Sequence, residues 1–258
     1  MEQLLDFPGG HPYSKFDGIH WRLVEMAELV RLGVPSDPAR CHAAVEVELA
    51  WLTSADREVP PQTDPVRPRW HAAQDGNAIY AITVLGHGAD ERVGELVGIV
   101  LAKQWPDGGW NCDRKPMAHR SSFHESVTTA LGLARYAQQF SHPEAAAAAA
   151  RTAELLLQHR LFRRSKTGEA IHSSWTVPHY PPYWHYDVLQ GLRLLDDLGL
   201  LDDPRADDAK EVLAGARVGD GFKGRSWSTA TQPAAVSYGR PPRNSMLNQR
   251  AHSLLTRG

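Results

Sequence analysis

The chain alternates between segments in which apolar residues recur every three or four positions and short breaks rich in glycine, proline or aspartate. Such spacing places apolar side chains on one face of a helix. No segment keeps the two-residue alternation that is typical of a half-buried strand. The pattern therefore predicts a nearly all-α chain. The predicted helical segments are residues 19–32, 39–52, 77–85, 90–103, 121–136, 143–161, 184–198, 207–216 and 244–255.

Most of these helices are paired across a short break. One break runs from Gly86 to Asp90 and a similar one from Gly199 to Asp202. In each, a glycine ends one helix and an acidic residue can cap the next. Four such pairs, recurring every roughly 45 to 60 residues, predict a helical-repeat architecture. Because a repeat array grows by adding pairs, we expect a single domain over residues 1–258.

Three long connections interrupt the predicted helices, at residues 53–74, 163–182 and 217–243. Loops of this length inside a compact domain usually carry function, and we expect them to gather on one side of the fold. Ser122 and Glu125 have the spacing of a capping box, which predicts a helix start at this point.

Composition narrows the class of protein. The 258 residues carry a formal charge of −2, with 42% apolar and 22% charged residues, which is typical of a globular chain without a strongly basic nucleic-acid surface. Two cysteines are too few for a disulfide framework. No apolar run approaches the about 18 residues of a membrane span, and no leader pattern opens the chain. We therefore expect a cytoplasmic protein, with eight tryptophans and thirteen histidines as its unusual feature.

One segment resembles a known motif. Gly98, Gln104, Gly108 and Trp110 follow the pattern of the QW motif of squalene and oxidosqualene cyclases. Gln104, late in one helix, can bond the free N–H groups at the next helix start, and Trp110 can lock neighbouring repeats together. Further stretches are similar to short squalene-cyclase-like or prenyltransferase-repeat proteins, namely residues 16–24, 107–113, 121–125 and 182–189.

The resemblance covers most of residues 13–213 and implies an α/α toroid, an inner and an outer ring of helices built from helical hairpins. The chain lacks the Asp-x-Asp-Asp acid of class II cyclases. It also lacks the Asp-Asp-x-x-Asp motif of prenyl-diphosphate enzymes, because the nearest match, Asp202 to Asp208, is one residue too long. That match also lies in an inter-helix turn, where capping is expected. With four helix pairs, we expect an open ring, or one closed by loops or by a partner. A homo-oligomer is one such arrangement.

The predicted inner helices begin with aromatic and polar residues, and in a toroid these starts face one mouth, where helix dipoles favour an anion. The acids there are candidates for general acid–base catalysis. The catalytic candidates are Asp187, Asp113, Glu125 and Asp75. The substrate-binding candidates are His20, Trp21, Trp70, Trp110, His124, Trp184, His185 and Tyr186. The simpler alternative is that each cluster caps its own helix.

These residues favour a protein that binds or converts a hydrophobic, isoprenoid-type small molecule in a central cavity, where aromatic walls also stabilise cations. Catalysis and simple binding both remain open. A second hypothesis is a non-catalytic toroid that binds a ligand or a protein. A third is a carbohydrate-active glycosidase or lyase with two carboxylates roughly 5 to 9.5 Å apart.

Two local clusters have alternative interpretations. Cys112, Asp113, His119 and His124 fall within thirteen residues and have zinc-ligating side chains, but their spacing is not that of a known zinc motif. We expect no cofactor, with zinc as the alternative. The basic run at residues 159–166 ends a predicted helix, where cations suit the dipole; a phosphate site is the alternative.

Overall fold

The computed structural model describes residues 1–62, 64–229 and 231–257. This part of the chain contains ten α-helices, two 3-10 turns and one short hairpin, which confirms the prediction of a nearly all-α protein. The α-helices are α1 (Glu2–Leu5), α2 (Ile19–Arg31), α3 (Pro38–Leu52), α4 (Ala72–Val84), α5 (Glu91–Ala102), α6 (Phe123–Phe140), α7 (Pro143–Gln158), α8 (Val188–Asp197), α9 (Asp207–Gly215) and α10 (Ser245–Thr256). The 3-10 turns are η1 (Ser173–Thr176) and η2 (Pro204–Ala206), and the strands are β1 (Arg217–Val218) and β2 (Gly221–Phe222).

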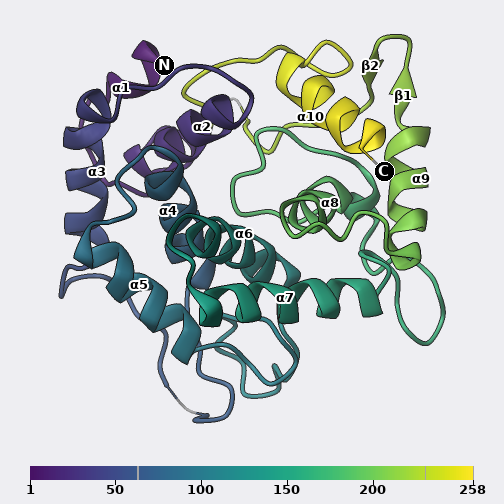
Figure 1. Ribbon diagram of the computed structural model, residues 1–258, viewed down its shortest axis with the longest axis horizontal. Helices are drawn as coiled ribbons and strands as arrows, with labels where there is room; N and C mark the ends of the chain where they lie inside the picture. The colour runs from purple at the N-terminus through teal and green to yellow at the C-terminus, as the bar shows by residue number, and fades with distance from the viewer. Residues whose placement is uncertain (63, 230, 258) are drawn as a thin grey trace.

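Helices α2, α4, α6 and α8 lie in the interior, and α3, α5, α7 and α9 lie around the outside (Figure 1). Each outer helix packs against the inner helix that precedes it, and successive inner helices pack against one another. Helix α10 packs against α8 and α9. Each long loop leads from an outer helix to the next helix of the chain, so the loops at residues 53–71 and 159–187 end at the starts of α4 and α8.

The start of α4 differs from the sequence prediction because a side chain of another helix caps it. Helix α4 begins at Ala72 rather than at residue 77, since the Glu125 carboxylate accepts a hydrogen bond from the Ala73 N–H at 2.9 Å. The capping box predicted at the start of α6 is only half formed. Ser122 accepts from the Glu125 N–H at 3.4 Å, but the Glu125 side chain does not return to the Ser122 N–H, which donates to Trp110 instead.

Helices α4 and α6 make the closest contact between two inner helices. A Cβ atom on Gly76 would lie 2.3 Å from the Thr129 Cα, and one on Gly132 would lie 2.3 Å from the Gly76 carbonyl oxygen. No side chain fits at these distances, so both positions require glycine for the two backbones to approach. This contact brings the starts of α4 and α6 together, where most of the candidate residues lie.

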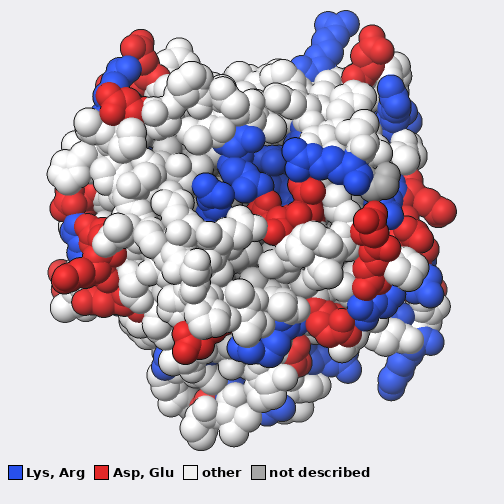
Figure 2. All heavy atoms as spheres, viewed as in Figure 1, with Lys and Arg blue, Asp and Glu red and all other residues white. Residues whose placement is uncertain are grey.

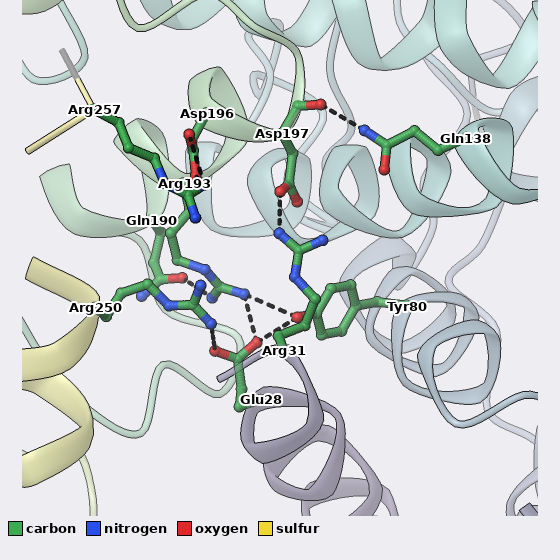
Figure 3. Close-up of polar contacts among 10 residues, drawn as sticks. All are labelled: Glu28, Arg31, Tyr80, Gln138, Gln190, Arg193, Asp196, Asp197, Arg250 and Arg257. Carbon is green, nitrogen blue, oxygen red and sulfur yellow. Dashed lines mark hydrogen bonds and ion pairs between the residues drawn. The ribbon is translucent and has the colours of Figure 1, made fainter. Parts of the chain in front are cut away.

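The centre of the helix assembly is held by a buried ionic network around Glu28 (Figure 3). Its Oε1 accepts hydrogen bonds from the Tyr80 hydroxyl at 2.7 Å and from Arg193 at 2.5 Å, and its Oε2 accepts one from Arg250 at 2.9 Å. Burial alone would raise the pKa of Glu28, but the two guanidinium groups lower it to about 2. The network therefore joins α2, α4, α8 and α10 through one carboxylate.

Little empty space remains beside this network. The hollow between α2, α4, α6 and α8 has a volume of about 10 Å³, and Val24, Asn77, Leu131 and Gln190 are among the residues that line it. This is room for about one water molecule. A ligand with an isoprenoid chain does not fit in the centre of the assembly, so a ligand cavity has to lie elsewhere.

The face viewed in Figure 2 carries acidic and basic side chains gathered near its middle. Asp196 and Asp197 lie at the carboxyl end of α8, where the helix dipole disfavours negative charge. Arg31 forms an ion pair with Asp197, and Arg257 one with Asp196 at 3.1 Å. These pairs offset the unfavourable position of the two acids.

Among the described residues, no helix combines the length and apolar character needed to cross a bilayer.

The Glu28 network predicts a large effect of a small change. Replacing Glu28→Gln removes the charge that compensates two buried guanidinium groups, and we expect the free energy of unfolding to fall by about 3–5 kcal/mol. Tyr80→Phe removes a single neutral donor and should cost only about 1 kcal/mol. Urea unfolding of the two variants measures the difference. A Glu28→Gln protein as stable as Tyr80→Phe would contradict the role assigned to the network.

A second buried acid, Glu25, predicts a dependence of stability on pH. Burial raises the pKa of Glu25 from its ordinary value of 4.5 to about 7, although the Tyr238 and Tyr183 hydroxyls donate to it at 3.0 and 3.3 Å. Because the folded state holds this proton more tightly, Glu25 lowers stability as pH rises from about 4.5 to about 7. The loss integrates to roughly 3 kcal/mol. Glu25→Gln should remove this component in unfolding measurements from pH 4 to 8; an unchanged pH profile would disprove it.

Candidate functional site

A cleft of about 660 Å³ opens at the start of α6, which we name the α6 cleft. It lies between the first turn of α6, the last turn of α7 and the loop that leads to α8. Its volume is in the range of small-molecule sites. The lining residues are Asp107, Arg120, Ser121, Ser122, Phe123, His124, Leu155, Gln158, His159, Arg164, Ser165, Lys166, Thr167, Ile171 and Trp175.

Aromatic and aliphatic side chains form much of the cleft wall. The rings of Phe123, the first residue of α6, and Trp175, in the turn η1, stack with centroids 4.9 Å apart and planes 16° apart. Both rings are at least nine-tenths buried, and Tyr186 packs against both from behind. Leu155 and Ile171 add aliphatic surface. This part of the cleft suits an apolar group, because burying such a group against it removes apolar area from water.

Basic side chains surround the same cleft. Arg120, Arg164 and Lys166 are exposed and line it. Within the described residues, Arg120 and Lys166 have no acidic partner within 4.0 Å. Asp107 is the one acid among the lining residues, and it accepts hydrogen bonds from the Ser121 hydroxyl and N–H at 2.6 and 2.8 Å. Together with the amino end of α6, these cations favour an anion.

One of the substrate-binding candidates, His124, lines this cleft, and its neighbours lie behind it. The His124 Nδ1 accepts a hydrogen bond from the Tyr186 N–H at 2.8 Å. Its ring lies 5.6 Å from that of Trp184 and 6.1 Å from that of His185. Burial lowers the pKa of His124 to about 4, so its imidazole is neutral at pH 7. Trp184, His185 and Tyr186, the candidates before α8, therefore lie behind the cleft lining, against His124, Phe123 and Trp175, and do not line the cleft themselves.

The candidate acids Asp75 and Glu125 lie buried beside each other at the starts of α4 and α6. Asp75 forms an ion pair with Arg57 at 2.7 Å and accepts a hydrogen bond from the Trp70 indole at 2.5 Å. Glu125 caps α4 and also accepts from the Cys112 thiol at 3.2 Å. Burial raises the pKa of both carboxyl groups. Neither lines the α6 cleft. Their contacts are structural, but they differ from the capping alternative, because Glu125 caps α4 rather than its own helix and Asp75 forms an ion pair.

The candidates on α2, His20 and Trp21, are also buried in the protein interior. The His20 Nδ1 lies 2.7 Å from the Glu48 carboxylate, and both side chains are buried. The Trp21 ring is fully buried and packs with Phe16 and Tyr183, whose own rings stack 3.9 Å apart. These contacts make the aromatic residues of α2 part of the protein interior.

The remaining catalytic candidates, Asp187 and Asp113, also make local contacts. Asp187 caps α8, which therefore begins at Val188 and not at residue 184, and its carboxylate accepts from the His179 N–H at 2.8 Å. Burial raises its pKa. Asp113 is exposed and accepts from the Lys115 N–H at 3.0 Å. Neither residue lines the α6 cleft.

The residues of the QW-like motif hold helices together. Trp110 is fully buried and its indole N–H donates to the Val100 carbonyl of α5 at 2.8 Å, while its backbone N–H donates to Ser126 of α6 at 3.0 Å. This is the locking role predicted for it. Gln104 behaves differently from the prediction. Its amide donates to the Ala148 carbonyl in the middle of α7 at 2.9 Å, not to a helix start.

The four residues considered for zinc do not converge. In the residues that the structure describes, no three His, Cys, Asp or Glu side chains are placed to hold a metal ion. Cys112 faces Glu125, His119 faces the Met117 carbonyl at 2.8 Å, and His124 faces Tyr186.

The acid at Asp203 caps the turn η2 through the Arg205 N–H, as the capping interpretation of that turn predicted.

Sequence reasoning missed the aromatic wall at Trp175 and the cation at Arg120. Trp175 lies in the short turn η1 and Arg120 in the loop before α6, and no helical periodicity marks the contacts of either residue. One signal was available, because the basic run at residues 159–166 contains Arg164 and Lys166, and its phosphate alternative placed cations at this position.

Comparisons of the chain with protein-family models, with curated proteins and with solved structures found no match.

Proposed function

We propose that the protein is an open α/α ring that binds an amphiphilic small molecule, with an isoprenoid-type apolar chain and an anionic head, in the α6 cleft. The placement of four inner helices within four outer ones supports the ring. The QW-like packing of Trp110 between α5 and α6 supports the likeness to terpenoid cyclases and prenyltransferases. The ligand site in this proposal is displaced from the ring centre, which the Glu28 network occupies.

The proposal is carried by an apolar wall and cations in one cavity. Phe123 and Trp175, which are mostly buried against each other, line the cleft together with Leu155 and Ile171. Arg120 and Lys166 line the same cleft, are exposed, and have no acidic partner within 4.0 Å in the described part of the chain. A purely apolar ligand would leave the cations without a partner, and a small anion would leave the apolar part of the cleft in contact with water. An amphiphile satisfies both, through area burial and charge-assisted hydrogen bonds.

Binding is better supported than conversion. The buried acids with raised pKa values, Asp75, Glu125 and Asp187, all serve helix caps or ion pairs and do not line the cleft. A general acid has to reach the atom that it protonates. We therefore favour the non-catalytic ligand-binding hypothesis. The carbohydrate-active alternative needs two carboxylates across the site, and Asp107 is the one acid among the residues that line this cleft.

The proposal is tested by calorimetric or fluorescence titration with farnesyl phosphate, with farnesol and inorganic phosphate as partial ligands. We expect farnesyl phosphate to bind more tightly than either partial ligand, because only it meets both the wall and the cations. Its affinity should fall with added salt, since rim charges are screened. Equal affinity for farnesol and farnesyl phosphate would contradict the assignment of the head group.

Charge reversal at the rim separates the two parts of the ligand. Lys166→Glu and Arg120→Glu should each weaken farnesyl phosphate binding about tenfold, as the loss of one charge-assisted contact predicts, and should leave farnesol binding unchanged. Ile171→Ser should weaken the binding of both farnesyl phosphate and farnesol. Arg217→Glu is the matched control, since Arg217 is exposed on β1, away from the cleft. If Arg217→Glu reduces affinity as much as Lys166→Glu, the effect is one of net charge and the cleft is not the site.

A further inference from the structure

The loop between β2 and α10 crosses over the starts of α2 and α8. We name its described stretches, residues 223–229 and 231–243, the strap. The Trp227 ring stacks on the rings of His179 and His185, with centroids 3.8 Å from each. Farther along, the Tyr238 hydroxyl donates to the buried Glu25 of α2 at 3.0 Å. The strap is thus fastened at two points by side chains.

The backbone of the strap is attached near its two ends and hardly at all between them. At the ends, the Arg225 N–H donates to the Pro178 carbonyl at 3.0 Å, the Arg225 carbonyl accepts from the Tyr180 N–H at 3.1 Å, and the Tyr238 carbonyl accepts from the Ser245 N–H at 3.2 Å. Among the described residues between 226 and 237, one backbone hydrogen bond reaches the rest of the chain, from the Phe16 N–H to the Pro233 carbonyl at 3.4 Å. The side-chain hydrogen bonds of Thr229 and Thr231 stay within the strap. A segment with few backbone hydrogen bonds and few buried contacts opens at lower free energy than the core.

The closed strap covers polar groups that have no partner. The indole N–H groups of Trp21, Trp184 and Trp227 and the Nδ1 of His185 are all buried without a hydrogen bond among the described residues. Trp21 is fully buried. An unsatisfied buried donor costs the free energy of its lost hydration. Opening the strap would let water or a ligand acceptor reach these groups, so the closed position is less stable by the free energy of their lost hydration.

The stack beneath the strap continues into the α6 cleft. His185 stacks on Trp184 with centroids 4.1 Å apart, and both rings contact His124, which lines the cleft. The cleft wall at Trp175 lies on the far side of His124, with ring centroids 5.9 Å apart. A continuous row of rings therefore leads from the cleft to Trp227.

We propose that the strap is a movable cover, closed by Trp227, whose withdrawal lengthens the α6 cleft across Trp184 and His185. The lengthened cleft takes the apolar chain of the ligand, and the uncovered ring N–H groups find water or ligand acceptors. This inference rests on the proposed binding function in the α6 cleft. It adds that long-chain ligands enter only when Trp227 leaves its stack.

The test compares wild type, Trp227→Ala and Tyr238→Phe by hydrogen exchange of the strap, without any ligand. Trp227→Ala should speed exchange about tenfold at the Arg225 and Tyr180 N–H groups, whose hydrogen bonds join the strap to the loop before α8, with a smaller effect in Tyr238→Phe. Association rates are then measured for farnesyl phosphate and for 3-methylbut-2-enyl phosphate, which is short enough for the closed cleft. Farnesyl phosphate should associate about tenfold faster with Trp227→Ala, and the short ligand at an unchanged rate.

Thr229→Ala is the matched control, because Thr229 belongs to the strap but bonds only within it. Unchanged strap exchange in Trp227→Ala, or an unchanged rate for farnesyl phosphate, would overturn the cover while leaving the binding function standing. The cover would also be overturned if the wild type binds 3-methylbut-2-enyl phosphate and Trp227→Ala still does not bind farnesyl phosphate. Failure of every variant to bind either phosphate would instead remove the binding function, and the role of the strap with it.

Discussion

One buried carboxylate, Glu28, ties three of the four inner helices to one another and to α10. It lies on α2 and accepts hydrogen bonds from α4 through Tyr80, from α8 through Arg193 and from α10 through Arg250. Removing a charge from such a network leaves buried partners uncompensated, so each of these helices depends on the same group. The last helix of the chain, α10, is thereby tied to the first long one, α2.

This arrangement also decides where a ligand can lie. Side chains of the network fill the centre, and the remaining hollow has room for about one water molecule. A cleft of about 660 Å³ lies instead at the start of α6, where the long loop before α8 brings Trp175 against Phe123 and where Arg120 and Lys166 remain unpaired within the described chain. In the proposed function, the packed interior of the helix assembly therefore supplies stability, and the loops at its edge supply the binding site.

The sequence predicted the helices better than the site, for a physical reason. Helical periodicity and caps are local, so the helical-hairpin order and the locking role of Trp110 followed from neighbouring residues. The positions of Asp75 and Glu125 were also predicted, at helix starts that do meet. Their roles were not, because a carboxylate that caps another helix and one that protonates a substrate have the same local sequence. Trp175 was missed since only the tertiary contact with Phe123 gives it meaning.

We propose that the α6 cleft holds an amphiphilic anion. Photocrosslinking with a farnesyl phosphate analogue that carries a diazirine on its chain, followed by mapping of the labelled peptides, tests this proposal without any change to the protein. We expect label on the lining segments at residues 120–124, 155–159 and 164–175, and competition by unlabelled farnesyl phosphate. Label confined to peptides outside these segments, or label that farnesyl phosphate does not displace, would contradict it.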